Sequence, residues 1–173
     1  MHSVYREIVS PILDKLDKKR TILDSETCHH LARELLHLTE ISPLTLKILE
    51  RLADRRGRFK DERLKVVLGG IEFENPLIVG AGWDKAGRAV KALHKLGFSG
   101  VELGAVLPDP QIGNPKPRQF IIGPGVVINR LGWNSPGVEA VKKNLERYKG
   151  SGIPIGVNVG INKGISEMQA PEM

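Results

Sequence analysis

The stretch that decides the fold is Asn75–Gly87, which reads NPLIVGAGWDKAG. A short apolar run, Leu77–Val79, ends at the small residues Gly80–Gly82, and the charged pair Asp84-Lys85 precedes a helical pattern. A strand that stops here places backbone N–H groups and one cation at its carboxyl end, where parallel α/β proteins bind ligands. Glycine also lets a flat or phosphorylated ligand approach the backbone closely. The stretch therefore predicts a ligand-binding strand end.

Two further apolar strands follow in an order that is typical of a parallel sheet. A helix is predicted over Ala89–Leu96, with Gly97 as its C-cap, and a strand over Gly100–Val106. A second helix is expected to start at the cap Ser135-Pro136, before a strand over Ile155–Gly160. Apolar strands joined by helices predict a parallel sheet with helical crossovers. In a barrel, the ends of these strands would converge on one mouth.

Hairpins and one long loop interrupt this order. Val66–Leu68 and Ile71–Phe73 flank Gly69-Gly70, which predicts a hairpin. Phe120–Ile122 and Val126–Ile128 are a second hairpin candidate. The loop from 108 to 118 contains four prolines, so we expect neither a helix nor a central strand there.

The first 64 residues have a different character, with few glycines and many Leu, Arg and His. Val4, Ile8, Ile12 and Leu16 recur every four residues, which predicts a helix. A second helix is expected from Asp24 or Ser25, and a third from Ser42-Pro43. Basic residues flank these helices: Lys15, Lys18, Lys19, Arg20, Arg51, Arg55, Arg56, Arg58 and Lys60. The pattern fits either a packed helical subdomain or a membrane-surface element with its cations on phospholipid headgroups.

The composition excludes several classes of protein. The net charge of +6 is compatible with a solvated basic surface or with attraction to anionic lipid or an anionic ligand. Only 5% of the residues are aromatic, which argues against nucleic-acid modules that stack bases. Cys28 is the only cysteine, so no intrachain disulfide forms, and we expect no metal site. Because the sequence shows neither a bilayer-spanning apolar run nor a secretory signal, we expect an intracellular protein.

Lys85 is the charge with the clearest chemical use. A fixed lysine at a strand end can neutralise negative charge on a reduced cofactor or bind a substrate carboxylate. The alternative is a lysine in the first turn of an exposed helix. The helix N-terminus disfavours a cation, which adds some weight to the functional interpretation but leaves both open.

Asparagines mark two further candidate positions. The cluster from Asn129 to Asn134 offers donors and acceptors that suit a planar cyclic amide, or it is a turn before the next helix. Asn158 lies in an apolar strand, where its amide must bond to the backbone or to a ligand. The segment Gly113–Arg118 is either a rigid loop beside the site or a structural loop. We interpret His29 and His30 as surface residues of a helix.

Four strings in order make a more specific signal than any one of them. NPLIVGAGWDKAG, GFSGVELGAVLPDPQIGNPKPRQF, INRLGWNSPGV and GVNVGINK resemble the dihydroorotate dehydrogenases, in particular the quinone-dependent class 2 enzymes. That class carries a helical extension before its barrel. The resemblance therefore implies an α/β fold: the N-terminal part of a (β/α)8 TIM barrel, about three strands long, after a small helical extension. It divides the chain into a membrane- and quinone-associated extension, 1–64, and the first part of an FMN-binding barrel, 65–173.

The resemblance also implies an activity and site residues. The family oxidises dihydroorotate to orotate in pyrimidine biosynthesis, and class 2 members pass the electrons to a membrane quinone. The positions that match FMN contacts are Ala81, Gly82, Trp83, Asp84, Lys85, Ala105 and Asn158. Those that match substrate contacts are Lys85, Asn129, Arg130, Leu131, Gly132 and Trp133. We therefore expect the chain to bind dihydroorotate or orotate and a membrane quinone, and its first helices to bind an anionic lipid surface. We expect the protein to be cytoplasmic and peripherally associated with the membrane.

The sequence departs from the family pattern in places. Ala105 stands where many members have threonine, Trp83 where close members have a smaller apolar residue, and Ile161 where they often have lysine. A complete barrel has about eight β/α units. The position matching the catalytic base, a serine in this class, is expected beyond Met173, which implies an incomplete active site. The alternatives are a non-catalytic membrane- or partner-binding module and a different FMN barrel acting on a related pyrimidine; the helical extension argues against the latter.

Overall fold

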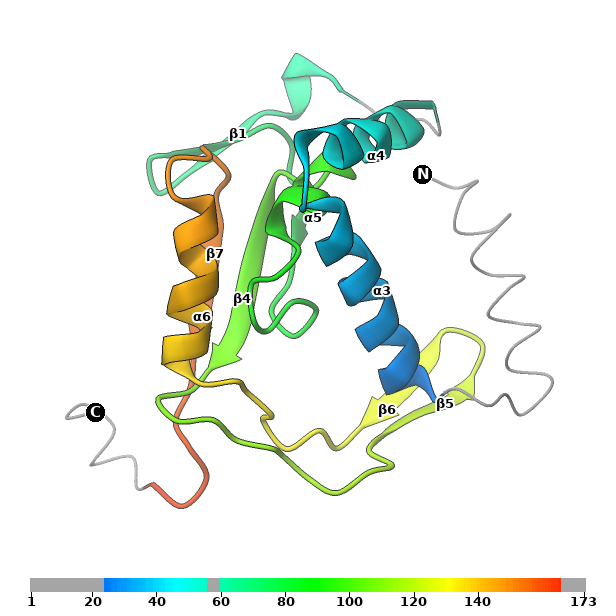
Figure 1. The fold of residues 1–173 in the computed structure, drawn as a ribbon, viewed down its shortest axis with the longest axis vertical. Helices are drawn as coiled ribbons and strands as arrows, with labels where there is room; N and C mark the ends of the chain where they lie inside the picture. The colour runs from blue at the N-terminus through cyan, green and yellow to red at the C-terminus, as the bar shows by residue number, and fades with distance from the viewer. Residues whose placement is uncertain (1–23, 56–59, 166–173) are drawn as a thin grey trace.

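The computed structural model describes residues 24–55 and 60–165, which form an α/β fold (Figure 1). The predicted first helix, with Val4 to Leu16, lies outside the described residues, as do the basic residues from Lys15 to Arg20 and Arg56 and Arg58. No helix among the described residues is long and apolar enough to cross a membrane.

Three parallel strands form the central sheet, as predicted. They are β3 (Ile78–Val79), β4 (Gly100–Val106) and β7 (Ile155–Val159), in the order β3-β4-β7. Ile78 pairs with Gly100, and Leu103 pairs with Val157. The carboxyl ends of the three strands therefore lie at the same edge of the sheet. The sheet is open, and the described residues do not close a barrel.

The core lies between the sheet and the crossover helices α5 (Val90–Lys95) and α6 (Val138–Leu145). Leu103 of β4 is fully buried, and Val90 and Val141 pack in the same cluster. Figure 1 shows α5 between α6 and helix α3 (Ser25–Thr39). Strand β4 is mostly buried because it has a strand on each side and helices over one face.

The predicted start of α6 at Ser135-Pro136 is wrong. The helix begins at Val138, its N-cap is Gly137, and no side chain caps it. Ser135 instead forms a backbone bridge with Gln111, with N···O distances of 2.9 Å in both directions. Its hydroxyl accepts a hydrogen bond from the Leu107 N–H at 3.3 Å. A tertiary contact therefore uses the residue that its local sequence favours as a cap.

Both predicted hairpins are confirmed. The first joins β1 (Val66–Leu68) to β2 (Ile71–Phe73), and the second joins β5 (Gln119–Gly123) to β6 (Val126–Asn129). The short helical turns η2 and η3 cover Glu62–Leu64 and Glu146–Tyr148. The second hairpin projects from the proline-rich loop towards the start of α3 (Figure 1).

The second and third predicted helices are also confirmed. Helix α3 covers Ser25–Thr39, and its N-cap Asp24 accepts a hydrogen bond from the Thr27 N–H at 2.9 Å. Helix α4 covers Pro43–Arg55. One side of α3 packs onto the core through Leu36. Both helices also carry exposed apolar side chains, which are Leu31, Leu35, Leu38, Leu44, Ile48 and Leu52.

Candidate functional site

An open pocket of about 920 Å³ lies between α3 and the carboxyl end of β3. The segment after β3 forms one wall, and α3 forms the wall opposite. Five of the predicted site residues line it: Ala81, Gly82, Trp83, Lys85 and Leu131. Glu26, His29 and Leu36 line it from the helix. The described fold thus opens a pocket at the strand end that the sequence singles out.

Lys85 is held in place by one asparagine. Its Nζ donates to Asn134 Oδ1 at 2.5 Å and to the Asn134 carbonyl oxygen at 3.2 Å. Among the residues that the structure describes, no carboxylate forms an ion pair with Lys85. Burial lowers the pKa of Lys85, and the nearby Arg118 guanidinium lowers it further, whereas Glu26 raises it. The site therefore contains a half-buried ammonium group with neutral acceptors.

His29 is half-buried and lines this pocket, so it is less exposed than the surface position that the sequence suggested. Its Nε2 lies 2.7 Å from the Trp83 carbonyl oxygen, which requires Nε2 to carry the proton. The rings of His29 and Trp83 meet edge to face, with their centroids 5.2 Å apart. His30 lines the same pocket but is exposed, as predicted. The position of Leu36, seven residues or about two helical turns after His29, could have signalled this orientation.

Asp84 lies between the wall residues Trp83 and Lys85 in the sequence but does not itself line the pocket. Its side chain is fully buried, and Oδ2 accepts a hydrogen bond from the Ala89 N–H at 2.8 Å. It thereby fixes the turn between β3 and α5. Its second oxygen, Oδ1, is buried and has no hydrogen-bond partner in the described part of the chain.

The predicted substrate segment, 129–133, is divided between different surroundings. Leu131 reaches the pocket of Lys85, whereas Gly132 and Trp133 line a second hollow of about 520 Å³ with Gln111 and Asn162. Trp133 has a left-handed backbone with φ of 55°. Such a conformation is uncommon for a bulky residue and is often found at functional sites.

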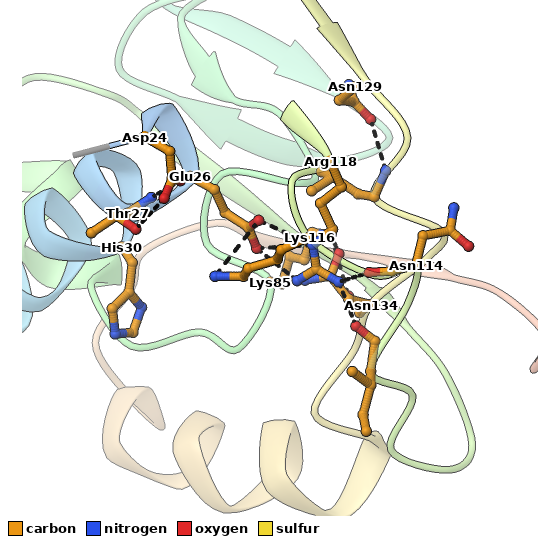
Figure 2. Close-up of polar contacts among 12 residues, drawn as sticks. Asp24, Glu26, Thr27, His30, Lys85, Asn114, Lys116, Arg118, Asn129 and Asn134 are labelled. Carbon is orange, nitrogen blue, oxygen red and sulfur yellow. Dashed lines mark hydrogen bonds and ion pairs between the residues drawn. The ribbon is translucent and has the colours of Figure 1, made fainter. Parts of the chain in front are cut away.

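Besides Asp84, four predicted site residues line neither hollow: Asn129, Arg130, Ala105 and Asn158. Figure 2 shows Asn129 apart from Lys85, with Arg118 between them. Asn158 is exposed on β7, and no described residue forms a hydrogen bond with its side chain. The structure therefore favours neither a backbone-bonded nor a ligand-bonded Asn158.

The residues around Lys85 suit a planar, negatively charged group. A Cβ atom added at Gly80 or Gly82 would meet no heavy atom within 4 Å, so the backbone of this wall is open to a ligand. The ammonium group of Lys85 lies at the same wall without an anionic partner among the described residues. An isoalloxazine ring, which is flat and gains negative charge on reduction, fits both properties.

Comparison with known proteins gives a consistent result. Residues 63–171 match the sequence profile of a family described as "Dihydroorotate dehydrogenase". A curated relative from a Nitratiruptor species, named dihydroorotate dehydrogenase (quinone), is 43% identical over 148 residues. That match covers 85% of this chain and 41% of the relative. The mouse protein named dihydroorotate dehydrogenase (quinone), mitochondrial, is 39% identical over 168 residues, which cover 92% of this chain and 38% of the mouse protein.

Solved structures agree with these sequence matches. A crystal structure of DHODH from Eimeria tenella in complex with ferulenol superposes with a TM-score of 0.60 and 33% sequence identity. The superposition covers 73% of this chain and 37% of that chain. The matches to the first curated relatives cover only about 40% of the relatives' length.

Proposed function

Because this chain belongs to the quinone-dependent dihydroorotate dehydrogenase family, we propose that it takes part in flavin-dependent oxidation of dihydroorotate to orotate. A quinone is the proposed electron acceptor, and FMN is the proposed cofactor. The observation that carries the proposal is the position of Lys85. Its half-buried ammonium group lies at the end of the first parallel strand and has only neutral acceptors among the described residues.

The residues of the pocket wall have separate roles in this proposal. When bound, FMN supplies the redox chemistry of the reaction. Lys85 balances negative charge at the strand end, and Asn134 holds its Nζ in position. The open backbone at Gly80–Gly82 lets a planar ring approach. Asp84 supports this wall by accepting a hydrogen bond from the N–H of Ala89, the N-cap of α5.

The remaining proposed contacts lie on neighbouring segments. We assign cofactor contacts to Ala81, Trp83, Ala105 and Asn158 as well, and substrate contacts to Lys85 and the segment 129–133. Ala105 and Asn158 support this assignment because they lie near the carboxyl ends of β4 and β7, at the same edge of the sheet as the end of β3. The proposed quinone acceptor is apolar, and apolar residues line the same pocket opposite the extension helix: Trp83, Leu93, Leu96 and Phe98. They support binding of the quinone there.

A flavin titration tests this proposal. FMN fluorescence is followed as the chain is added, and the variant Lys85→Met is compared with Lys143→Met, which removes an exposed lysine from α6. We expect Lys85→Met to weaken binding by at least about tenfold, because a hydrogen bond to a charged group contributes about 1.5–3 kcal/mol. Lys143→Met should bind as the unchanged chain does. Failure of the unchanged chain to bind at millimolar FMN, or equal binding by Lys85→Met, would contradict the proposal.

A second candidate function rests on the two extension helices. Their exposed leucines, with Arg51 and Arg55 on α4, favour a non-catalytic module that binds a membrane surface or a protein partner. We propose peripheral attachment to an anionic lipid surface in a cytoplasmic protein, which is compatible with either function. Flavin binding that depends on Lys85 distinguishes the enzymatic function from the module.

A further inference from the structure

Arg118, at the end of the proline-rich loop, is almost completely buried and forms hydrogen bonds in several directions. Its Nε donates to Glu26 Oε2 at 3.0 Å, and its Nη2 donates to Glu26 Oε1 at 2.6 Å. Its Nη1 donates to the carbonyl oxygens of Ile112 at 2.6 Å and Asn114 at 3.0 Å (Figure 2). One guanidinium group therefore holds both the first turn of α3 and the loop before β5.

That loop is fastened in turn to the segment 129–133. The Arg118 carbonyl oxygen accepts a hydrogen bond from the Arg130 N–H at 2.7 Å. The Asn114 N–H donates to the Leu131 carbonyl oxygen at 3.0 Å, and Asn114 Nδ2 donates to the Arg130 carbonyl oxygen at 2.8 Å. A Cβ at Gly132 would lie 2.7 Å from Asn114 Cγ, so the two loops approach too closely for a side chain there. Displacement of either loop would therefore disturb the other.

We propose that Arg118 is a positioning residue that ties the extension helix α3 to the segment 129–133. The pair with Glu26 holds Arg118, Arg118 holds the carbonyl groups of Ile112 and Asn114, and Asn114 holds the backbone of Arg130 and Leu131. The assignment of 129–133 as a substrate-binding segment rests on the proposed function, whereas the hydrogen-bonded connection between α3 and this segment does not. Helix α3 and the segment 129–133 thus share one hydrogen-bonded centre.

The geometry of arginine is essential to this role. A guanidinium group presents donors in a planar fork and serves a carboxylate and two carbonyl groups together, whereas a lysine ammonium is a point charge on a flexible stem. A buried cation that loses its carboxylate is strongly destabilised. Arg118 without Glu26 therefore leaves its position, and the contacts it makes with the loop are lost with it.

Amide hydrogen exchange, followed by NMR on the full chain without flavin, tests the connection. In Glu26→Gln we expect exchange at the Arg130 and Asn114 amides to rise about tenfold, because local opening becomes easier when the buried pair is lost. Glu34→Gln is the matched control. It breaks another ion pair of α3, with Arg88 at 2.9 Å, and should leave both amides unchanged.

A role of Glu26 confined to docking α3 would leave the Arg130 and Asn114 amides as protected as in the unchanged chain, and that result would overturn the proposal. Arg118→Lys provides the conservative test: we expect exchange to rise as in Glu26→Gln, and full protection would show that the fork is not required. If Arg118→Lys does not give a dispersed spectrum, Glu26→Gln decides alone. Because no flavin or substrate is used, the outcome is independent of the titration that tests the proposed function.

Discussion

At Lys85, the protein maintains a cation in an environment that disfavours it. Burial lowers the pKa of this side chain, and Arg118 lowers it further. Asn134 stabilises the ammonium group by hydrogen bonds but brings no opposite charge. A buried ammonium group without an opposite charge lowers the stability of the fold. An anionic ligand would supply the missing charge, so the arrangement indicates a ligand-binding role for Lys85.

This arrangement has a consequence for the pH dependence of stability. Since the folded-state pKa of Lys85 lies below the ordinary value of 10.5, the unfolded chain binds more protons between these two values. The unchanged chain should therefore gain stability, relative to Lys85→Met, as the pH rises towards 10.5. Urea unfolding between neutral and alkaline pH measures this difference. No difference between the two chains, or a difference of opposite sign, would show that the folded-state pKa of Lys85 is not lowered.

The role of a single residue could be predicted best where one short sequence segment contains all the residues that indicate it. Lys85 stands out because glycines and a strand precede it. The roles of Asn134, His29 and Arg118 depend on partners far away in sequence: Lys85 lies 49 residues from Asn134, Trp83 lies 54 from His29, and Glu26 lies 92 from Arg118. Local patterns report propensity, whereas such pairs arise only when the chain packs.

At the scale of elements, strong local signals located the strands and helices of the described part of the chain. The apolar run of β4, the Gly-Gly turn of the first hairpin and the Asp24 cap of α3 all have local physical causes. The start of α6 could not be predicted in this way. Serine followed by proline is a typical helix N-cap, but the backbone of Ser135 pairs with Gln111. Its hydroxyl group accepts a hydrogen bond from the Leu107 N–H. Tertiary hydrogen bonds outweighed the local preference there.

Helix α4 carries a prediction about membranes. Leu44, Ile48 and Leu52 are exposed, and helical spacing places Arg51 and Arg55 on the same face. We expect the chain to bind vesicles that contain anionic lipid, because apolar burial and headgroup attraction act together. The double variant Arg51→Glu/Arg55→Glu should lose most of this binding in a sedimentation assay, and high salt should weaken binding of the unchanged chain.

A matched variant separates this effect from net charge. Lys142→Glu/Lys143→Glu reverses two cations on α6 and should retain vesicle binding. Equal loss in both double variants would indicate a general charge effect. Binding that is insensitive to salt and to both variants would show that the electrostatic part of the prediction is wrong.

At the scale of the whole molecule, the described residues form an open sheet with two outer strands. Strand β3 has two residues and β7 has five, so β7 presents the longer unpaired edge. The parallel sheet was predictable from the alternation of strands and helices, whereas closure into a barrel is not shown by the described residues. The division into an extension, 1–64, and a barrel part, 65–173, stays a prediction. In the structure, Glu26 and Glu34 of α3 pair with Arg118 and Arg88 across that boundary.

The edge at β7 leads to a prediction about association. Val157 and Val159 are 44% and 78% exposed, and an apolar edge strand is a template for pairing with another chain. We expect the chain to self-associate as its concentration rises, which light scattering coupled to gel filtration measures. Val159→Lys should shift the equilibrium towards monomer, because a charged edge residue opposes pairing. Val67→Lys, on the exposed hairpin strand β1, adds the same charge elsewhere and should leave association unchanged. A monodisperse monomer at every concentration would mean that the β7 edge is protected in solution.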